Sequence, residues 1–214
     1  MSGPLRLVVA DDQAILRSGL VALLRLEQGI DVVGEAADGA GALEAVAAHR
    51  PDVLLLDVQM PAGVLADGSA GPADGIAVAE RLRDTPDAPR IIVLTTFGRA
   101  GYLRRTMEAG AAGFMVKDTP VEQLVDAIRR VHQGLKVVDP ELAAQSLAVG
   151  PSPLTAKETE VLQAAAAGGT TAAIAARLFL SEGTVRNHVS AAIGKLGVTG
   201  RAEAVRAATD NGWI

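Results

Sequence analysis

The sequence "DVLLLDVQMP" at residues 52–61 decides how the first part of the chain folds. Four apolar residues in a row follow the turn-like "RPD" that ends at Asp52. This pattern indicates a buried strand of a parallel sheet. The run ends at Asp57, and burying a carboxylate without a partner is costly. An acidic residue at the end of such a strand therefore needs a physical reason.

Short apolar runs alternate with amphipathic segments through most of the chain. Strands are predicted at 5–10, 30–36, 52–57, 90–95 and 113–116, and helices at 13–27, 38–49, 74–84, 99–109 and 120–133. Strands that alternate with helices imply right-handed crossovers and a parallel sheet. We expect an α/β fold with a doubly wound, five-stranded parallel sheet that helices cover on both faces.

The pattern changes at residues 143–155, "AAQSLAVGPSPLT", whose prolines, serines and glycine predict a linker. Four helical segments follow, with no strand-like run among them. Thr155 and Glu158, at the start of the first segment, fit a capping box. We expect the α/β domain at 1–133, a linker at 134–153 and a small all-α domain at 154–214.

Composition excludes several classes of protein. The 214 residues include no cysteine, which excludes disulfides, cysteine-ligated zinc and thiol catalysis. No apolar run approaches the ~20 residues of a membrane span. The start, "MSGPLRLVVADD", lacks the apolar core of a signal peptide. We expect a cytoplasmic protein with no membrane partner.

Charge is distributed unevenly along the chain. Residues 1–150 hold 14 Lys and Arg against 20 Asp and Glu, whereas residues 151–214 hold 6 against 5. An acidic first part and a nearly neutral second part suggest two domains with different partners. The second part is too weakly basic to indicate nucleic acid from charge alone.

Polar residues stand at the carboxyl ends of four predicted strands, where ligands bind in parallel sheets. They are Asp11, Asp12, Asp57, Thr95, Thr96 and Lys117. Two like charges ~4 Å apart repel by about 4 kcal/mol at an effective dielectric of ~20, so three carboxylates cannot lie together bare. Mg²⁺ prefers oxygen ligands and would relieve this repulsion. A carboxylate held there can act as a nucleophile toward phosphorus, which gives the buried strand a reason to end in Asp57.

Residues 5–133 resemble the CheY-like receiver domain of bacterial two-component response regulators. The match rests on "VVADD", "LLLDVQMP", "DG" at 74–75, "VLTT" and "GFMVKD". The resemblance implies that Asp57 accepts a phosphoryl group from the phosphohistidine of a sensor histidine kinase. It also implies that Asp12 and Asp57 bind Mg²⁺ directly, Asp11 through water and Gln59 through its backbone carbonyl.

The same resemblance assigns three further residues. It implies that Thr95 is the switch hydroxyl and Lys117 the phosphate-binding lysine. Phe114 stands where an aromatic switch residue is usual, and it can equally be read as a core aromatic. With "TTFGRAGYLRR" at 95–105 and the terminal "NGWI", the chain is most similar to the DesR-like branch of the family.

One segment departs from the family pattern. Twelve residues, "AGVLADGSAGPA" at 62–73, separate Pro61 from Asp74, where family members usually have only a couple. The segment is small, polar and rich in glycine, so we expect a mobile surface loop that buries little. Two readings stay open: a neutral decoration, or a role in kinase access or phosphate lifetime.

Residues 154–214 resemble the helix-turn-helix domain of LuxR/NarL-type regulators, which indicates the NarL/FixJ family. "TTAAIAARL" is then the supporting helix, "LSEG" the turn and "GTVRNHVSAAIGKLG" the recognition helix. Arginine can read guanine, and asparagine can read adenine, in the major groove. The residues expected to contact double-stranded DNA are Thr184, Arg186, Asn187, His188, Ser190 and Lys195, with His188 and Ser190 assigned to phosphates.

A dimer on DNA is expected because a nearly neutral domain with one recognition helix offers little affinity by itself. We expect phosphorylation to drive homodimerisation, with residues 200–213 pairing in the DNA-bound form. There Ala202, Val205 and Ala208 offer a small apolar stripe. RNA polymerase is a further candidate partner.

Two other classes of function fit less well. An aspartyl-phosphate hydrolase needs a second acid two positions after the nucleophile as general acid/base, and Gln59 stands there. A dinucleotide-binding protein needs G-x-G-x-x-G between the first strand and helix, whereas "DGAGALEA" at 38–45 is only superficially similar. We therefore expect a phosphorylation-switched transcription factor, not an enzyme.

Overall fold

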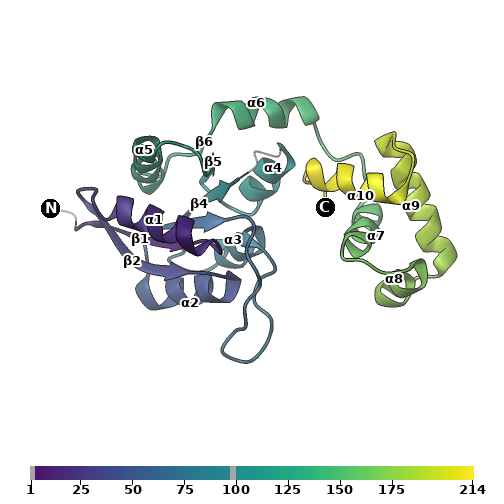
Figure 1. The fold of residues 1–214 in the computed structure, drawn as a ribbon, viewed down its shortest axis with the longest axis horizontal. Coiled ribbons are helices and arrows are strands. Elements are labelled where there is room, and N and C mark those ends of the chain that lie inside the picture. The colour runs from purple at the N-terminus through teal and green to yellow at the C-terminus, as the bar shows by residue number, and fades with distance from the viewer. Residues whose placement is uncertain (1–2, 97–99) are drawn as a thin grey trace. The chain divides into compact units, whose positions relative to one another are not determined.

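A computed structural model describes residues 3–96 and 100–214 of the chain (Figure 1). The strands are β1 (Leu5–Ala10), β2 (Ile30–Ala36), β3 (Val53–Asp57), β4 (Arg90–Thr95), β5 (Gly113–Val116) and β6 (Val137–Val138). The helices around them are α1 (Ala14–Leu24), α2 (Gly39–His49), α3 (Gly75–Arg83), α4 (Ala100–Glu108) and α5 (Val121–His132). The helix predicted from residue 99 begins at Ala100, and residue 99 lies outside the described ranges.

The sheet has the order β2-β1-β3-β4-β5-β6, with every neighbouring pair parallel. The predicted doubly wound parallel sheet is confirmed, but the predicted count of five strands is wrong. The sixth strand pairs with β5, and the Val137 amide donates to the Ala112 carbonyl at 2.9 Å. Strand β6 and helix α6 (Pro140–Val149) both lie in the segment that we predicted as a linker.

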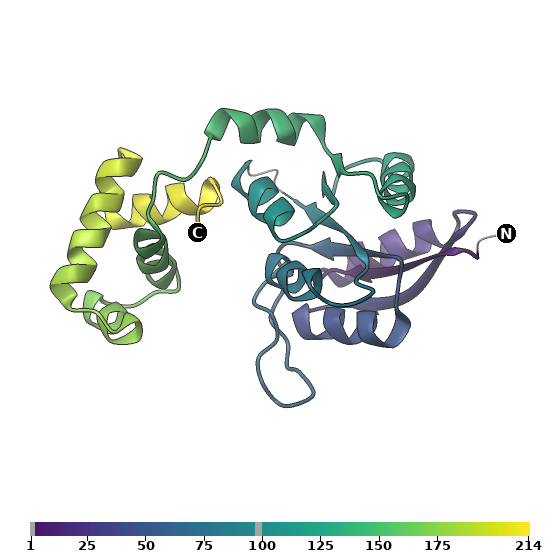
Figure 2. The same cartoon turned by 180° about the vertical axis from the view of Figure 1, so that it is seen from behind.

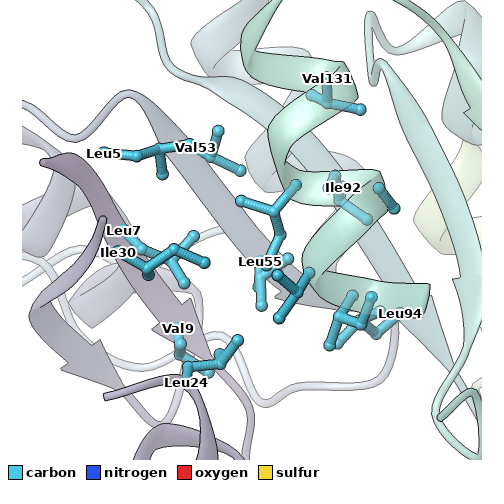
Figure 3. Close-up of a cluster of buried hydrophobic side chains, with 14 of the residues drawn as sticks. Leu5, Leu7, Val9, Leu24, Ile30, Val53, Leu55, Ile92, Leu94 and Val131 are labelled. Carbon is cyan, nitrogen blue, oxygen red and sulfur yellow. The ribbon is translucent and has the colours of Figure 1, made fainter. Parts of the chain in front are cut away.

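The side chains of the central strands alternate between two buried faces. Figure 3 shows Leu7, Val9, Leu55 and Ile92 in one cluster, together with Val131 of α5. Helices α1 and α5 cover this face, and α2 and α3 cover the other (Figure 1). Because both faces are covered, the strands are apolar along their length, as the sequence pattern predicted.

The C-terminal part consists of α7 (Ala156–Ala166), α8 (Thr171–Leu178), α9 (Glu182–Leu196) and α10 (Arg201–Asp210). These helices belong to the second of the two compact units of the chain, whose main segment is Ala144–Ile214. The capping box is present, since Thr155 accepts a hydrogen bond from the Glu158 amide and Glu158 accepts one from Thr155. Among the described residues, no helix is long and apolar enough to cross a membrane.

Helix α10 uses its apolar residues inside its own domain. Ala208 is fully buried, and Val205 packs against the buried clusters of the C-terminal helices. Of the predicted stripe, Ala208 is buried and not available for a dimer contact, whereas Ala202 is exposed and Val205 is half-buried. Pairing through residues 200–213 stays a prediction.

The insertion forms a hairpin that projects from the sheet domain (Figures 1 and 2). Val64 and Ala70 pair across it as an antiparallel bridge. Its tip is exposed, whereas Pro72 at its base is buried. The prediction of a loop that buries little is thus wrong for the base of the insertion.

Candidate functional site

The carboxyl ends of β1, β3 and β5 bring two acids and one lysine together. The Lys117 Nζ lies 2.7 Å from Asp11 Oδ2 and 2.8 Å from Asp57 Oδ2. The side chains are nearly inaccessible, with 3% of each carboxylate and 6% of the lysine exposed. One ammonium therefore faces two buried carboxylates, which leaves an excess of negative charge.

This excess charge is visible in the pKa values. Burial raises the pKa of Asp57, and the nearby Lys117 lowers it too little to compensate. Burial lowers the pKa of Lys117, but hydrogen bonds and charges from Asp11 and Asp57 outweigh burial, and the pKa rises overall. The cation is thus well stabilised and the Asp57 carboxylate is not. A second positive charge would stabilise the site.

A hard divalent cation fits these residues. Asp11, Asp12 and Asp57 each offer a carboxylate oxygen, and the three oxygens lie within 4.8 Å of one another. Asp12 is exposed, so the cluster has one side open to water. Three oxygen ligands with room for water are the environment that Mg²⁺ prefers. The Gln59 amide donates to Asp57 Oδ1 at 3.2 Å, so the residue predicted to offer its carbonyl stands beside the cluster.

Two other predicted residues are buried on the adjacent strands. Thr95 ends β4 with 4% exposure, and its carbonyl accepts a hydrogen bond from the Lys117 amide at 2.8 Å. Phe114 on β5 is fully buried. Burial fits its reading as a core aromatic, and its role as a switch stays a prediction.

Sequence reasoning missed one residue, Arg17, and one close contact, that of Gly75, which support the site. The Arg17 guanidinium donates to the Asp11 carbonyl and lies 3.6 Å from Glu35, which fixes the loop after β1. A Cβ on Gly75 would lie 1.9 Å from the Asp57 carbonyl oxygen, so α3 begins directly against the peptide of Asp57. The motif "DG" signalled this glycine, but nothing in the sequence indicated the contact.

Helix α9 presents a polar surface. Arg186, Asn187 and Ser190 are exposed, and Thr184 and His188 are half-buried. The Thr184 amide donates to Ser181 Oγ at 3.0 Å as part of the helix cap. Arg186 also forms an exposed ion pair with Glu182, at 3.3 Å within the same helix. Arg186, Asn187 and Ser190 therefore all lie on the accessible surface of the helix.

Lys195 has a different environment. Its Nζ lies 2.7 Å from Glu158 Oε2, and Glu158 is only 5% exposed. Burial acts to raise the pKa of Glu158, but hydrogen bonds from Lys195 and Thr155 outweigh it and lower that pKa. The structure thus gives Lys195 a partner on α7, where we had predicted a contact with DNA.

Comparison with known proteins agrees with this architecture. Residues 7–129 match the response regulator receiver domain, and residues 152–208 match the luxR family of bacterial regulatory proteins. The chain is 40% identical to the uncharacterized transcriptional regulatory protein YvfU of Bacillus subtilis over 98% of this chain and 100% of that protein. It is 39% identical to the transcriptional regulatory protein DesR of the same organism, over 96% and 97%.

Solved structures show the same fold. The crystal structure of ChrA, a response regulator of a heme-sensing two-component system, matches with 33% identity and a TM-score of 0.57 over 100% of both chains. The structure of the response regulator RcsB in complex with DNA matches with 25% identity and a TM-score of 0.66, over 97% of this chain and 99% of that one.

A receiver domain joined to a LuxR-type helix-turn-helix domain defines a response regulator that regulates transcription. The chain belongs to the NarL/FixJ family of two-component response regulators. The family predicted from the sequence is thereby confirmed, and DesR, after which the predicted branch is named, is among its relatives.

Proposed function

We propose that Asp57 is the phosphoacceptor, and that a sensor histidine kinase supplies the phosphoryl group from a phosphohistidine. The observation that carries this proposal is the burial of Asp57 beside one lysine and a second acid. A carboxylate oxygen of Asp57 attacks phosphorus, and the bond from phosphorus to the histidine nitrogen breaks.

The neighbouring residues stabilise the transferred group. Lys117 holds its ammonium within 2.8 Å of Asp57 and binds the new phosphoryl oxygens. Asp12, Asp57 and the Gln59 carbonyl would hold Mg²⁺ directly, and Asp11 through water. When bound, Mg²⁺ neutralises charge on the phosphoryl oxygens. Because Gln59 is no general acid/base, the protein acts as a switch and not as a turnover enzyme.

Phosphorylation changes the population of two states of the receiver domain. Thr95 donates its hydroxyl to the phosphoryl group, and Phe114 reports the change to the rest of the domain. We propose that the active state forms a homodimer. In the DNA-bound dimer residues 200–213 pair, and of the apolar residues there Ala202 is exposed and Val205 half-buried, whereas Ala208 is buried within its own domain.

The dimer binds double-stranded DNA through two copies of α9 placed one helical turn apart, ~10 base pairs between centres. Arg186 and Asn187 are proposed to read bases, and Thr184, His188 and Ser190 to contact the backbone. The relative RcsB has been solved with DNA, which supports this use of the domain. RNA polymerase is a candidate partner, and a cytoplasmic location is proposed because the protein acts on DNA. The division into 1–133, 134–153 and 154–214 remains our proposal for the domains.

Labelling with acetyl phosphate tests the phosphoacceptor. Asp57→Asn should lose labelling, as measured by intact mass. In Asp12→Asn, labelling should no longer depend on Mg²⁺. Asp67→Asn is the matched control, because Asp67 lies on the exposed tip of the insertion. Undiminished labelling of Asp57→Asn would overturn the assignment.

A further inference from the structure

The insertion is tied to α2 by main-chain hydrogen bonds. Gly39 and Ala40 are the first residues of α2. The Gly39 amide donates to the Pro61 carbonyl and the Ala40 amide to the Ala62 carbonyl, each at 2.9 Å. The first four N–H groups of an α-helix have no partner within the helix. In α2 the Gly41 amide donates to the Asp38 side chain at 2.7 Å, and the Ala42 amide makes the first regular helical bond, to the Asp38 carbonyl at 3.0 Å. The start of the insertion therefore completes the cap of α2.

Both strands of the hairpin fit closely at this point, and we call residues 61–63 and 71–72 the insertion base. Gly63 has a φ of +67°, and a Cβ there would lie 2.3 Å from Asp38 Oδ1. A Cβ on Gly71 would lie 2.0 Å from the Ala62 carbonyl oxygen. These contacts leave room for glycine only, so the base is a built contact rather than a loose crossing of two loops.

The insertion base continues directly into the segment that carries Gln59. At the other end of that segment, the Val58 amide donates to the Leu94 carbonyl at 3.1 Å, and the Val58 carbonyl accepts from the Gly75 amide at 2.9 Å. The backbone N–H of Gln59 donates to the side chain of Asp57. Gln59 is thus held between two anchors, one on β4 and α3 and the other on α2.

We infer that the insertion base is a positioning element for the metal-binding loop. This inference rests on the proposed function, in which the Gln59 carbonyl is a ligand of Mg²⁺. Restraining the loop at the insertion base keeps this carbonyl directed at the metal and raises affinity for Mg²⁺. In the tip at 64–70 the main-chain hydrogen bonds join Leu65 with Ser69 and Gly68, and we expect the tip to contribute nothing to Mg²⁺ binding. The insertion is therefore more than decoration at its base, and it acts by holding the loop that follows Asp57.

A pair of matched glycine variants in the full-length protein separates base from tip. Gly63 and Gly68 both have left-handed backbones, with φ of +67° and +82°, but a Cβ on Gly68 would meet nothing within 4 Å. The dissociation constant of Mg²⁺ is measured from amide chemical shifts, and hydrogen exchange of the Gly39 and Ala40 amides reports on the base. Gly63→Ala should weaken Mg²⁺ binding on the order of tenfold, as the loss of support for a metal ligand does. In Gly63→Ala the Gly39 and Ala40 amides should exchange faster than in the wild type. Gly68→Ala should match the wild type in both Mg²⁺ affinity and amide exchange.

The outcomes distinguish the inference from the proposed function. If Gly63→Ala speeds amide exchange but binds Mg²⁺ with wild-type affinity, or if Gly68→Ala weakens binding equally, the inference is wrong. If thermal melting shows that Gly63→Ala is unfolded, Ala40→Pro replaces it, because proline removes this N–H yet is tolerated in the first helical turn. If the wild type does not bind Mg²⁺, or if Asp12→Asn binds it equally well, the proposed site itself fails.

Discussion

Replacing Gly75 by alanine tests whether α3 begins against the end of β3, at Asp57. A Cβ on Gly75 would lie 1.9 Å from the carbonyl oxygen and 2.9 Å from the carbonyl carbon of Asp57. Ordinary contact begins at 3.4 Å, so the start of α3 must move by about 1.5 Å. The clashing atoms belong to the backbone, and no side-chain rotation relieves the overlap. The movement would therefore disturb the peptide of Asp57.

The expected loss of stability follows from two contributions. Overpacking of this kind costs about 1–3 kcal/mol. The movement also stretches the hydrogen bond from the Gly75 amide to the Val58 carbonyl, whose net contribution is about 0.5–1.5 kcal/mol. We expect Gly75→Ala to lower the free energy of unfolding of this domain by about 2–4 kcal/mol, which corresponds to a melting temperature lower by roughly 10 °C.

Differential scanning calorimetry of two variants measures this effect. Gly19, in α1, is the matched control, because a Cβ there would meet nothing within 4 Å. Alanine is favoured over glycine inside a helix by about 1 kcal/mol, so Gly19→Ala should melt above the wild type. Gly75→Ala should melt below it and accept phosphate from acetyl phosphate more slowly. A Gly75→Ala protein that melts at the wild-type temperature and labels normally would refute this reasoning.

Three further predictions concern charges. Asp57→Asn should melt above the wild type at neutral pH without Mg²⁺. In the wild type the pKa of Asp57 is raised, so the folded state binds the carboxyl proton more tightly than the unfolded state does. Wild-type stability therefore falls as pH rises from about 3.8 through the raised pKa, and the variant escapes this loss. Equal melting temperatures at neutral pH would contradict the excess of negative charge at the site. Lys195→Met should make the C-terminal domain lose stability at a higher pH during acidification, because the lowered pKa of Glu158 gives stability that is lost as pH falls through it; an unchanged acid profile in thermal melts would exclude this. Arg186→Ala should weaken operator binding by about 1–3 kcal/mol in fluorescence anisotropy at fixed salt, and Lys195→Met by less; equal losses would contradict the different roles of the two residues.

The central strands could be predicted because their apolar runs are long and unbroken. Residues 53–56 in β3 signal burial on both faces without any knowledge of their neighbours. Strand β6 has only Val137 and Val138, which is too short to form a pattern. It pairs with the sheet because Gly113 and Phe114 lie beside it, and this proximity is a property of the folded chain.

Contacts between distant segments could not be predicted. The composition of the insertion predicted mobility, yet Gly63 and Gly71 are needed for close approach to α2. Glu158 was recognised as part of a capping box, but nothing near it indicated an ion pair with Lys195. At the candidate site, by contrast, each acid and the lysine follow a predicted strand, and the topology of a parallel sheet was enough to bring them together.

The ion pair between residues 11 and 117 has a consequence for synthesis of the protein on the ribosome. Asp11 leaves the exit tunnel early, whereas Lys117 directly follows β5. A nascent chain that already contains Asp11 and Asp57 still lacks the ammonium that pairs with both. Contacts so distant in sequence form late and close the fold as a whole. If Asp57 is the phosphoacceptor, a nascent chain that has not reached β5 cannot be switched on, and switching reports that the sheet is built through β5.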